Sequence, residues 1–593
     1  MLFNTKIANK IPYDELGKAF YYGLRLDIST ACYFTVIPLF GLTLAHFTAN
    51  NTISKLIKLY SIIVVILVCI VSLIDAQLYE YWGQKLNAYA SSFAKFPKEM
   101  FSFSSGISYA KLIFFVFLIF FIVSTIFDNL VLQIKNVATI EVSKIKLFVF
   151  FIISAAILFL GIRGSIGMSP INQSFAYYST TPFCNHASTN TIWNFIATLV
   201  DNSEDEKRNP YSTIPQDEAD KIVNKLLQQP AITKKISWTD KKQPDIVLII
   251  LEGWTADVVK KTGGEYNVTP NMNNWAKNSL LYTNFYANGN RTDKGLASIL
   301  SAEPSLAKSS IINKLQKYNN LPALPKNLAK AGYHNKFVYG GESEFANMKA
   351  YWINSGFTNI IDIHQFDKAI LPESWGVHDN VLFDKLLNEI NNTPSPKFIS
   401  ALTLSSHEPY DVPHSSIFKE KTQADMYRNA VHFADEALGN FLSSAAKSNW
   451  YDNTLIIILS DHGHYQPLNR NPYQPERFHI PCWITGGALN KNLQNKIVSK
   501  ISDQTDLTPT ILEQLGLSNK DYKWGKSMLD TLSKNGLATY TFNDGIGFIT
   551  KEGFVVYDAE SKKIILNEGK NKETLSIQAQ AFLQTHYNDY LQR

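Results

Sequence analysis

The spacing of apolar residues divides the chain into two parts with different patterns. Before Gly164, apolar residues gather in four long runs: Ile28–Phe47, Leu59–Ile74, Leu112–Val131 and Leu147–Ile162. A membrane-spanning helix needs roughly 20 apolar residues, or fewer where flanking side chains reach the interface. Lysine and arginine residues border these runs, which is typical of membrane spans and unusual for buried helices of a soluble protein. We therefore predict a helical transmembrane domain over residues 1–163.

The residues after Gly164 change from an interfacial to a soluble pattern. Residues 164–243 begin with aromatic side chains and continue with charged residues and prolines, with one helical pattern at Ala219–Leu227. This composition predicts an interfacial and linker segment, because Trp and Tyr rings favour the membrane surface. We divide the remainder into a folded domain over residues 244–545 and its C-terminal extension over residues 546–593.

From Asp245 onward, short apolar runs alternate with amphipathic stretches. The predicted strands are Asp245–Leu251, Lys336–Tyr339, Lys397–Leu404, Thr454–Leu459 and Ile480–Thr485. The predicted helices are Gly295–Leu300, Leu324–Lys330, Val381–Glu389, Met426–Leu442 and Leu507–Leu515. Such alternation indicates an α/β domain with a mostly parallel sheet that helices cover on both faces. In these sheets, sites lie just beyond the carboxyl ends of the strands.

Acidic and imidazole side chains follow three of these strands. Glu252 follows the first strand, His407 the third, and the pair Asp461-His462 the fourth. Carboxylate and imidazole groups are ligands of divalent cations, so the pattern predicts a metal site. Each residue also has an ordinary interpretation, as a solvated turn residue, a loop histidine or a helix N-cap. Structural or supporting roles are open for two further histidines, His464 and His479.

Thr292 lies just before the predicted helix Gly295–Leu300, and two interpretations of it are compatible. Thr292 and the following Asp293 suit the N-cap of that helix. A hydroxyl at this position, beside Arg291 and free backbone N–H groups, also suits an anionic phosphoryl group. A cation at the hydroxyl oxygen would lower its pKa and prepare it as a nucleophile near neutral pH.

Composition narrows the class of protein further. The chain has 593 residues, which is too long for a single core, and a formal net charge of +5. This charge is mild, and no basic run carries interleaved aromatic residues, so we expect no nucleic-acid partner. The four cysteines show no C-x-x-C spacing, which argues against a thiolate zinc site.

Four motifs together resemble the lipoteichoic acid synthase and phosphoglycerol transferase family, within the sulfatase and alkaline phosphatase superfamily. They are Ile250–Trp254, Gly289–Gly295, Thr403–Tyr410 and Leu459–Gly463, in the same order as in that family. The resemblance implies a sulfatase-like (alkaline-phosphatase-type) α/β catalytic domain behind the helical membrane domain. It also implies one divalent ion, which we expect to be Mn²⁺, with Zn²⁺ or Mg²⁺ as alternatives. By the same resemblance the metal ligands are Glu252, Thr292, Asp461 and His462.

The resemblance further implies a reaction. Thr292 would be the nucleophile, and His407 and Arg291 would assist at the phosphate of the transferred group. The chain would be a multi-pass protein of the plasma (inner) membrane with an extracytoplasmic catalytic domain. It would move phosphoglycerol from a phospholipid donor, phosphatidylglycerol, through a phospho-threonine to the hydroxyl of a glycan or glycerol-phosphate acceptor. The alternatives are a phosphoethanolamine transferase, a sulfatase-like phosphoester hydrolase, and a scaffold without activity.

Two features depart from the family pattern. The loop after the second predicted strand has Gly341, Ala346 and Met348 where family synthases carry an acid, a tryptophan and an arginine. The loss of an arginine removes a phosphate contact, which puts polymer elongation in doubt. In addition, four spans would leave the basic N-terminal segment outside, against the positive-inside rule. A fifth helix ahead of Met1, as the family has, would resolve this conflict.

Overall fold

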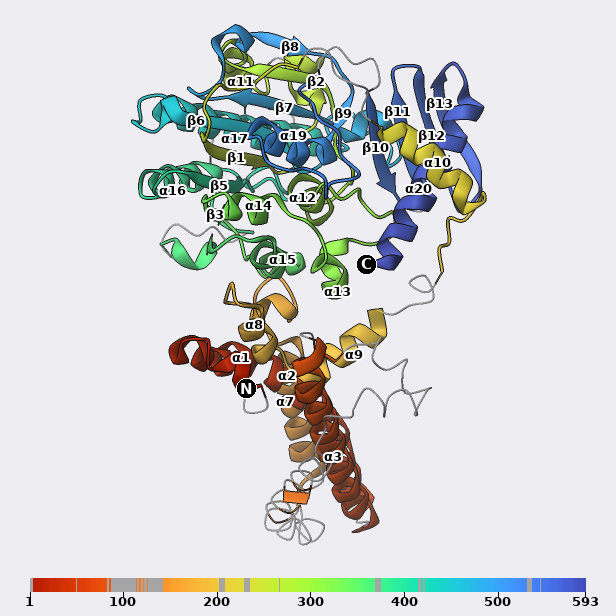
Figure 1. The fold of residues 1–593 in the computed structure, drawn as a ribbon. Helices are drawn as coiled ribbons and strands as arrows, with labels where there is room; N and C mark the ends of the chain where they lie inside the picture. The colour runs from red at the N-terminus through yellow and green to blue at the C-terminus, as the bar shows by residue number, and fades with distance from the viewer. Residues whose placement is uncertain are drawn as a thin grey trace. The chain divides into compact units, whose positions relative to one another are not determined.

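The computed structural model separates into two compact units, Met1–Glu204 and Asp205–Arg593 (Figure 1). It describes residues 4–48, 51–82, 85–86, 114, 117–118, 121, 125, 142–201, 208–228, 235–265, 267–367, 375–413, 417–419, 422–530, 536–543 and 545–593. Apolar helices near the N-terminus precede a mixed α/β domain, and the predicted fold class is confirmed in this respect. The four-part division of the chain stays a prediction.

Three helices of the first unit are long and apolar enough to cross a membrane. They are α2 (Tyr13–Thr48), α3 (Asn51–Trp82) and α7 (Lys144–Arg163), with candidate spans at Tyr13–Leu44, Lys55–Ala76 and Lys144–Arg163. These spans correspond to three of the four predicted runs, and most of the fourth, Leu112–Val131, lies outside the described residues. The composition of the three helices supports a membrane protein.

The same unit carries a small polar cluster at the end of α3. Lys85 Nζ lies 2.9 Å from Asp75 Oδ2, and both side chains are buried. Thr191, at the start of helix α9 (Thr191–Asp201), donates to the same carboxylate oxygen at 2.8 Å. These contacts neutralise a buried carboxylate and join α9 to α3. The described part of this unit also contains two other short helices, α1 (Thr5–Ala8) and α8 (Pro182–Ser188).

The second unit is built on a nine-stranded sheet (Figure 1). The strand order is β4-β3-β5-β1-β6-β7-β2-β8, and β9 pairs with β2. The bounds are β1 Asp245–Leu251, β2 Leu280–Tyr286, β3 His334–Tyr339, β4 Asn359–Ile361, β5 Lys397–Leu402, β6 Thr454–Ser460, β7 His479–Thr485, β8 Lys496–Val498 and β9 Ser502–Asp503. All five predicted strands are present. The expected mostly parallel arrangement is confirmed, and β7 is antiparallel to both β6 and β2.

Helices cover this sheet as the sequence pattern predicts. Every residue of β1 is buried, so both faces of the strand are covered. The second unit contains helices α10 Gln216–Leu227, α11 Pro270–Trp275, α12 Thr292–Ser301, α13 Leu315–Tyr318, α14 Leu324–Lys330, α15 Met348–Ser355, α16 Asp379–Asn391, α17 Gln423–Ala445, α18 Pro475–Phe478, α19 Leu507–Gln514 and α20 Lys572–Gln592. Helices α16 and α17 share one core with alternate residues of β1 and β6. Helices α12, α14 and α19 contact one another.

A second, antiparallel sheet follows the first. It contains β10 (Leu537–Phe542), β11 (Gly545–Thr550), β12 (Gly553–Asp558) and β13 (Lys563–Gly569), paired in chain order. Helix α20 packs against β11, β12 and β13, and α10 packs against α20. The predicted boundary after residue 545 falls at the beginning of β11, inside this sheet.

A buried carboxylate joins the C-terminal helix to the end of α12. Glu303 accepts from His586 Nε2 at 3.0 Å and from Arg593 Nη2 at 2.9 Å, and its side chain is 1% exposed. Glu303→Gln removes the charge that accepts these two hydrogen bonds, while Asp589 Oδ2, 2.8 Å from the same nitrogen, still pairs with Arg593. Loss of a hydrogen bond to a charged group costs about 1.5–3 kcal/mol. We expect a loss of stability of this order in urea unfolding of the full chain in detergent. Lys385→Gln, which removes only a half-buried helix pair, should cost under about 0.5 kcal/mol.

Candidate active site

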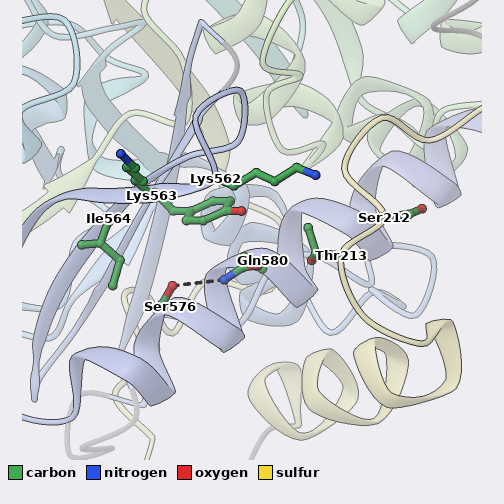
Figure 2. A pocket seen from close by; sticks show the side chains of 8 residues that line it. Ser212, Thr213, Lys562, Lys563, Ile564, Ser576 and Gln580 are labelled. Atoms are coloured by element: carbon green, nitrogen blue, oxygen red, sulfur yellow. Dashed lines mark hydrogen bonds between the residues drawn. The ribbon is translucent and has the colours of Figure 1, made fainter.

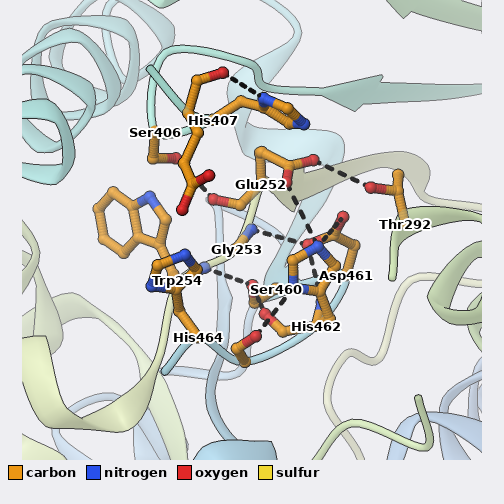
Figure 3. A network of polar contacts seen from close by, with 12 residues as sticks. Glu252, Gly253, Trp254, Thr292, Ser406, His407, Ser460, Asp461, His462 and His464 are labelled. Carbon is orange, nitrogen blue, oxygen red and sulfur yellow. Dashed lines mark hydrogen bonds and ion pairs between the residues drawn. The ribbon is translucent and has the colours of Figure 1, made fainter. Parts of the chain in front are cut away.

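The register of the two central strands brings the predicted acidic residues together. β1 and β6 are parallel neighbours, with Leu251 opposite Ser460. Glu252 and Asp461 therefore follow adjacent strand ends, and Gly253 N donates to Asp461 Oδ1 at 2.8 Å (Figure 3). This is the carboxyl edge of the sheet, where the sequence pattern predicts the site.

Asp461 has one satisfied and one unsatisfied carboxylate oxygen. Oδ1 accepts from the backbone N–H groups of Gly253 and His462, the latter at 2.7 Å. Oδ2 is buried and makes no hydrogen bond to any residue that the structure describes. A buried carboxylate oxygen without a hydrogen bond is costly, and a cation bound beside it would satisfy it.

His462 is oriented to present its second ring nitrogen to the two carboxylates. Its Nδ1 lies 2.8 Å from Gly463 O, which can only accept, so Nδ1 carries the proton and donates. Its Nε2 lies 3.3 Å from Glu252 Oε1 and 3.6 Å from Asp461 Oδ2. The ligand atoms of all three residues lie within 4.8 Å of one another. Two carboxylates and an imidazole with a fixed tautomer fit one divalent cation.

The charges in this cluster depend strongly on one another. Burial alone would raise the pKa of Glu252, but the hydrogen bond and charge of His462 outweigh it and hold this pKa at about 2. Burial and the charge of Glu252 raise the pKa of Asp461 to about 7. Burial opposes a charged His462, yet the two carboxylates raise the pKa of His462 to about 10. In the metal-free protein, protonated His462 therefore supplies the positive charge.

Metal binding is accordingly expected to release protons. A metal ligand must be deprotonated, and below pH 10 His462 is protonated in the metal-free protein. The affinity for Mn²⁺ should therefore fall about tenfold for each unit of decreasing pH, and more steeply below pH 7, where Asp461 is also protonated. Calorimetric titration in buffers of different ionisation enthalpy should give about one proton released at pH 8. Release of no proton would contradict this assignment.

Thr292 lies beside the same carboxylates. It is the first residue of α12, and its Oγ1 donates to Glu252 Oε2 at 3.2 Å (Figure 3). Arg291 occupies the N-cap position, and no side-chain hydrogen bond caps the helix there. The N-cap interpretation of Thr292 is therefore wrong, since its hydroxyl contacts the cluster instead. The side chain of Arg291 is exposed next to it.

The close approach of α12 to the end of β6 depends on a glycine. A Cβ on Gly295 would lie 2.0 Å from the backbone oxygen of Asp461. Gly295→Ala must therefore displace α12, and with it Thr292, away from Glu252. A displacement of about 1 Å can lower a catalytic rate about 100-fold. We expect a loss of this size in kcat. Gly17→Ala in α2, where the new methyl meets nothing within 4 Å, should leave kcat unchanged.

His407 follows β5 and is placed by the loop around it. The loop is anchored to the site, because Ser406 Oγ donates to Glu252 O at 2.5 Å and Glu252 N donates to Thr403 Oγ1 at 2.9 Å. His407 is half-buried, and its ring lies 4.3 Å from the ring of Trp375. Its positive charge, when present, also favours ionised Glu252. The structure thus brings His407 to the border of the cluster.

The two further histidines have structural positions. His464 stacks on Tyr427 with 4.4 Å between ring centroids, and burial lowers the pKa of His464 to about 3. His479 stacks on Tyr286, and its Nε2 lies 2.7 Å from Thr283 O. Both rings therefore pack against aromatic side chains.

Several residues that support the site carry no sequence signal of their own. Ser460 Oγ lies 2.8 Å from Leu251 O and from Trp254 N, which ties β6 to the turn after β1. Gln504 Nε2 donates to Ser460 O at 2.8 Å and to Asp461 O at 2.6 Å. A serine and a glutamine of this kind are common, so only the folded geometry identifies them.

Two other features lie apart from this cluster. Glu344, Asp362 and His364 also form a group of possible ligands, but Lys349 Nζ lies 2.8 Å from Glu344 Oε1 and already neutralises it. A surface cavity of 640 Å³ opens between the β12–β13 turn and α20 (Figure 2). Its lining is Ser212, Thr213, Tyr557, Lys562, Lys563, Ile564, Ser576 and Gln580, and none of these is a predicted site residue.

Known proteins are similar in sequence to this chain. The sulfatase family matches residues 244–517. The chain is 22% identical over 360 residues to the lipoteichoic acid synthase-like protein YvgJ of Bacillus subtilis (strain 168), covering 54% of this chain and 57% of that protein. It is 23% identical over 420 residues to the lipoteichoic acid synthase of Staphylococcus aureus (strain USA300), covering 66% of this chain and 61% of that protein. The chain thus spans about three fifths of these relatives' length.

Solved structures agree on the fold. A protein of the alkaline phosphatase superfamily from Vibrio parahaemolyticus superposes with a TM-score of 0.56 at 24% identity, covering 64% of this chain and 98% of that one. The lipoteichoic acid synthase LtaP from Listeria monocytogenes superposes with a TM-score of 0.51 at 18% identity, covering 63% and 98%. Residues 244–517 therefore match the sulfatase family and share the fold of these solved structures, and the chain is similar in sequence to proteins named as lipoteichoic acid synthases.

Proposed function

We propose that this chain is a membrane-anchored phosphotransferase that moves phosphoglycerol from phosphatidylglycerol to an acceptor hydroxyl. The observation that carries the proposal is the Thr292 hydroxyl, 3.2 Å from Glu252 at the edge of a cluster that fits one divalent cation. The named synthases among its relatives support the transfer of a phosphoester group. The acceptor is a glycan or a glycerol phosphate.

Each proposed residue has a distinct task. Thr292 Oγ1 attacks phosphorus, the bond from phosphorus to the diacylglycerol oxygen breaks, and the proton of the Thr292 hydroxyl ends on that oxygen. Glu252 accepts the hydrogen bond of the Thr292 hydroxyl and so orients it for attack. His407 and Arg291 stabilise the phosphate oxygens.

The ligand set is proposed to be Glu252, Asp461, His462 and the hydroxyl of Thr292. When bound, the cation supplies positive charge that stabilises the phosphate oxygens. Three oxygen donors and one imidazole suit Mn²⁺, with Zn²⁺ and Mg²⁺ as the alternatives to be measured. The unsatisfied oxygen of Asp461 supports this set.

The membrane helices would hold the enzyme at the bilayer that contains its lipid donor. The diacylglycerol product is insoluble in water and stays in the bilayer, so a tethered enzyme works where donor and product lie. We propose a multi-pass arrangement in the plasma (inner) membrane with the sulfatase-family domain on the extracytoplasmic side. Phospholipid and acceptor would meet at that surface.

The donor is tested by identifying the group that Thr292 receives. The full chain in detergent is incubated with Mn²⁺ and either phosphatidylglycerol or phosphatidylethanolamine, quenched in acid, and digested. Mass spectrometry of the Thr292 peptide should show a phosphoglycerol adduct from phosphatidylglycerol only. A phosphoethanolamine adduct would instead identify a phosphoethanolamine transferase. Free glycerol phosphate released without acceptor would identify a phosphoester hydrolase.

A further inference from the structure

An arginine flanks the active site without having been assigned to it. Arg477 lies in the short helix α18, and its carbonyl oxygen lies 1.9 Å from the position of a Cβ on Gly463. The next carbonyl, of Phe478, accepts from Ala287 N at 2.8 Å. Helix α18 therefore packs between the loop after β6 and the loop before α12, the two loops that form the site.

The guanidinium of Arg477 lacks a counter-charge in the described part of the chain. Its Nε is buried and makes no hydrogen bond there, and no described carboxylate lies within 4.0 Å of it. Burial lowers the pKa of Arg477, as expected for an uncompensated charge. Arg470 is the contrasting case, because two of its nitrogens lie 3.0 Å from the carboxylate of Asp257, and its pKa is raised. Arg477 is half-buried and has no counter-charge among the described residues, which leaves its guanidinium available to an anionic ligand.

Tyr465 connects Arg477 to the loop that carries His407. The guanidinium carbon of Arg477 lies 5.7 Å from the centroid of the Tyr465 ring. The hydroxyl of Tyr465 donates to Glu408 Oε1 at 2.7 Å, and Tyr410 donates to the same oxygen at 3.0 Å. Glu408 is thus held by two hydroxyls and does not pair with Arg477. The acid closest in sequence, Glu476, is exposed.

We propose that Arg477 binds a phosphate group of the acceptor, and so selects acceptors that carry phosphate over neutral ones. This inference rests on the proposed function. The donor phosphate is bound at Thr292, whereas the guanidinium of Arg477 lies against the Tyr465 ring, so it suits a second phosphate. Arginine presents parallel N–H donors that match two phosphate oxygens, and its contact with the Tyr465 ring limits its motion.

Arg477 takes no part in the bonds that form and break during transfer. The acceptor hydroxyl attacks the phosphorus on Thr292, and a new bond forms between the acceptor oxygen and phosphorus. The bond between phosphorus and Thr292 Oγ1 breaks, and the proton of the acceptor hydroxyl is transferred to Oγ1. Arg477 holds the acceptor by its existing phosphate, which should lower the KM for that acceptor.

The test compares glycerol 1-phosphate with glycerol as acceptors for the full chain. They share the attacking hydroxyl and differ in the phosphate. Arg477→Gln should raise the KM for glycerol 1-phosphate about 10- to 100-fold, the range of a charge-assisted hydrogen bond. The KM for glycerol, and the rate of Thr292 adduct formation from phosphatidylglycerol, should stay within about twofold. Arg470→Gln is the matched control and should leave the ratio of the two KM values unchanged.

Arg477→Lys keeps the charge without the two parallel donors, so its KM for glycerol 1-phosphate should lie between those of the wild type and the Gln variant. If the Gln variant fails to fold, the Lys variant provides the test of the proposal. An unchanged KM ratio in both variants, or an equal rise for both acceptors, would overturn the proposal. A wild-type chain that forms no Thr292 adduct would overturn the proposed function instead, and that result is read from a separate measurement.

Discussion

Thr292→Ala is expected to lower phosphoglycerol transfer about 1,000-fold or more, while the protein stays folded and still binds the cation. The variant removes the oxygen that attacks phosphorus, and loss of a nucleophile is among the largest effects in mutant kinetics. Little stability should be lost, because Thr292 is only partly buried and makes one side-chain hydrogen bond, to Glu252. Transfer is measured with phosphatidylglycerol and an acceptor, and folding by thermal unfolding in detergent.

Thr292→Ser is the matched control for this variant. It keeps a hydroxyl in the same place and should retain activity within about tenfold of the wild type. A Thr292→Ala protein with nearly full activity would show that another group attacks phosphorus. A Thr292→Ser protein as inactive as the alanine variant would also contradict the account, since it would point to the methyl group.

Asp461→Asn should abolish the stabilisation of the protein by Mn²⁺. At a free metal concentration of 100 times Kd, the wild type should gain about 2.7 kcal/mol of stability. Loss of a charged ligand is expected to weaken the affinity by more than about 100-fold, since even supporting residues cost 10- to 100-fold. The variant should therefore gain little stability at the same concentration. Thermal unfolding with and without Mn²⁺ measures both values.

Without metal, the same variant should be more stable than the wild type above pH 7. The folded-state pKa of Asp461 is raised to about 7, so the carboxylate destabilises the folded state once it ionises. The protonated form is favourable below the usual pKa near 4, and this advantage is lost as pH rises through 7. Asparagine avoids that loss and can keep the hydrogen bond from Gly253. An Asn variant that unfolds more easily than metal-free wild type at pH 8 would contradict this explanation.

The central strands were the most predictable part of the fold. The runs of β1 and β6 consist almost entirely of branched apolar residues, and every residue of both strands is buried. Such continuous apolar runs are typical of a parallel strand that is buried on both faces. β2 (Leu280–Tyr286) went unpredicted because Thr283 and Asn284 interrupt its apolar pattern at half-buried positions. The antiparallel direction of β7 depends on long-range pairing, which no local pattern specifies.

The second sheet and α20 were hard to predict from the sequence for a different reason. Glycines within β11 and β12 lower the strand propensity of this segment. The two strands form because they pair with each other in the sheet. The position of α20 depends on long-range contacts such as that between Glu303 and His586. These contacts join residues far apart in the sequence and cannot be found by periodicity.

The candidate site also contains some residues that could be predicted from the sequence and others that could not. Glu252, Asp461 and His462 were predictable because strand ends locate them, and parallel pairing of β1 and β6 makes those ends adjacent. Thr292 could not be assigned from the sequence, since an N-cap and a nucleophile use the same residue type at the same place. Only the distance of 3.2 Å to Glu252 separates the two interpretations. Arg477 showed no motif, and its missing counter-charge is visible only in the folded chain.

The position of the cation is the most direct test of the whole account. Crystals of the protein grown with Mn²⁺ should give an anomalous peak at the manganese absorption edge between Glu252, Asp461 and His462. Ligand distances should be about 2.0–2.3 Å, with the Thr292 oxygen among the ligands. A peak at other residues, or a bound ion with Thr292 well outside coordination distance, would contradict the proposed nucleophile and with it the transfer reaction.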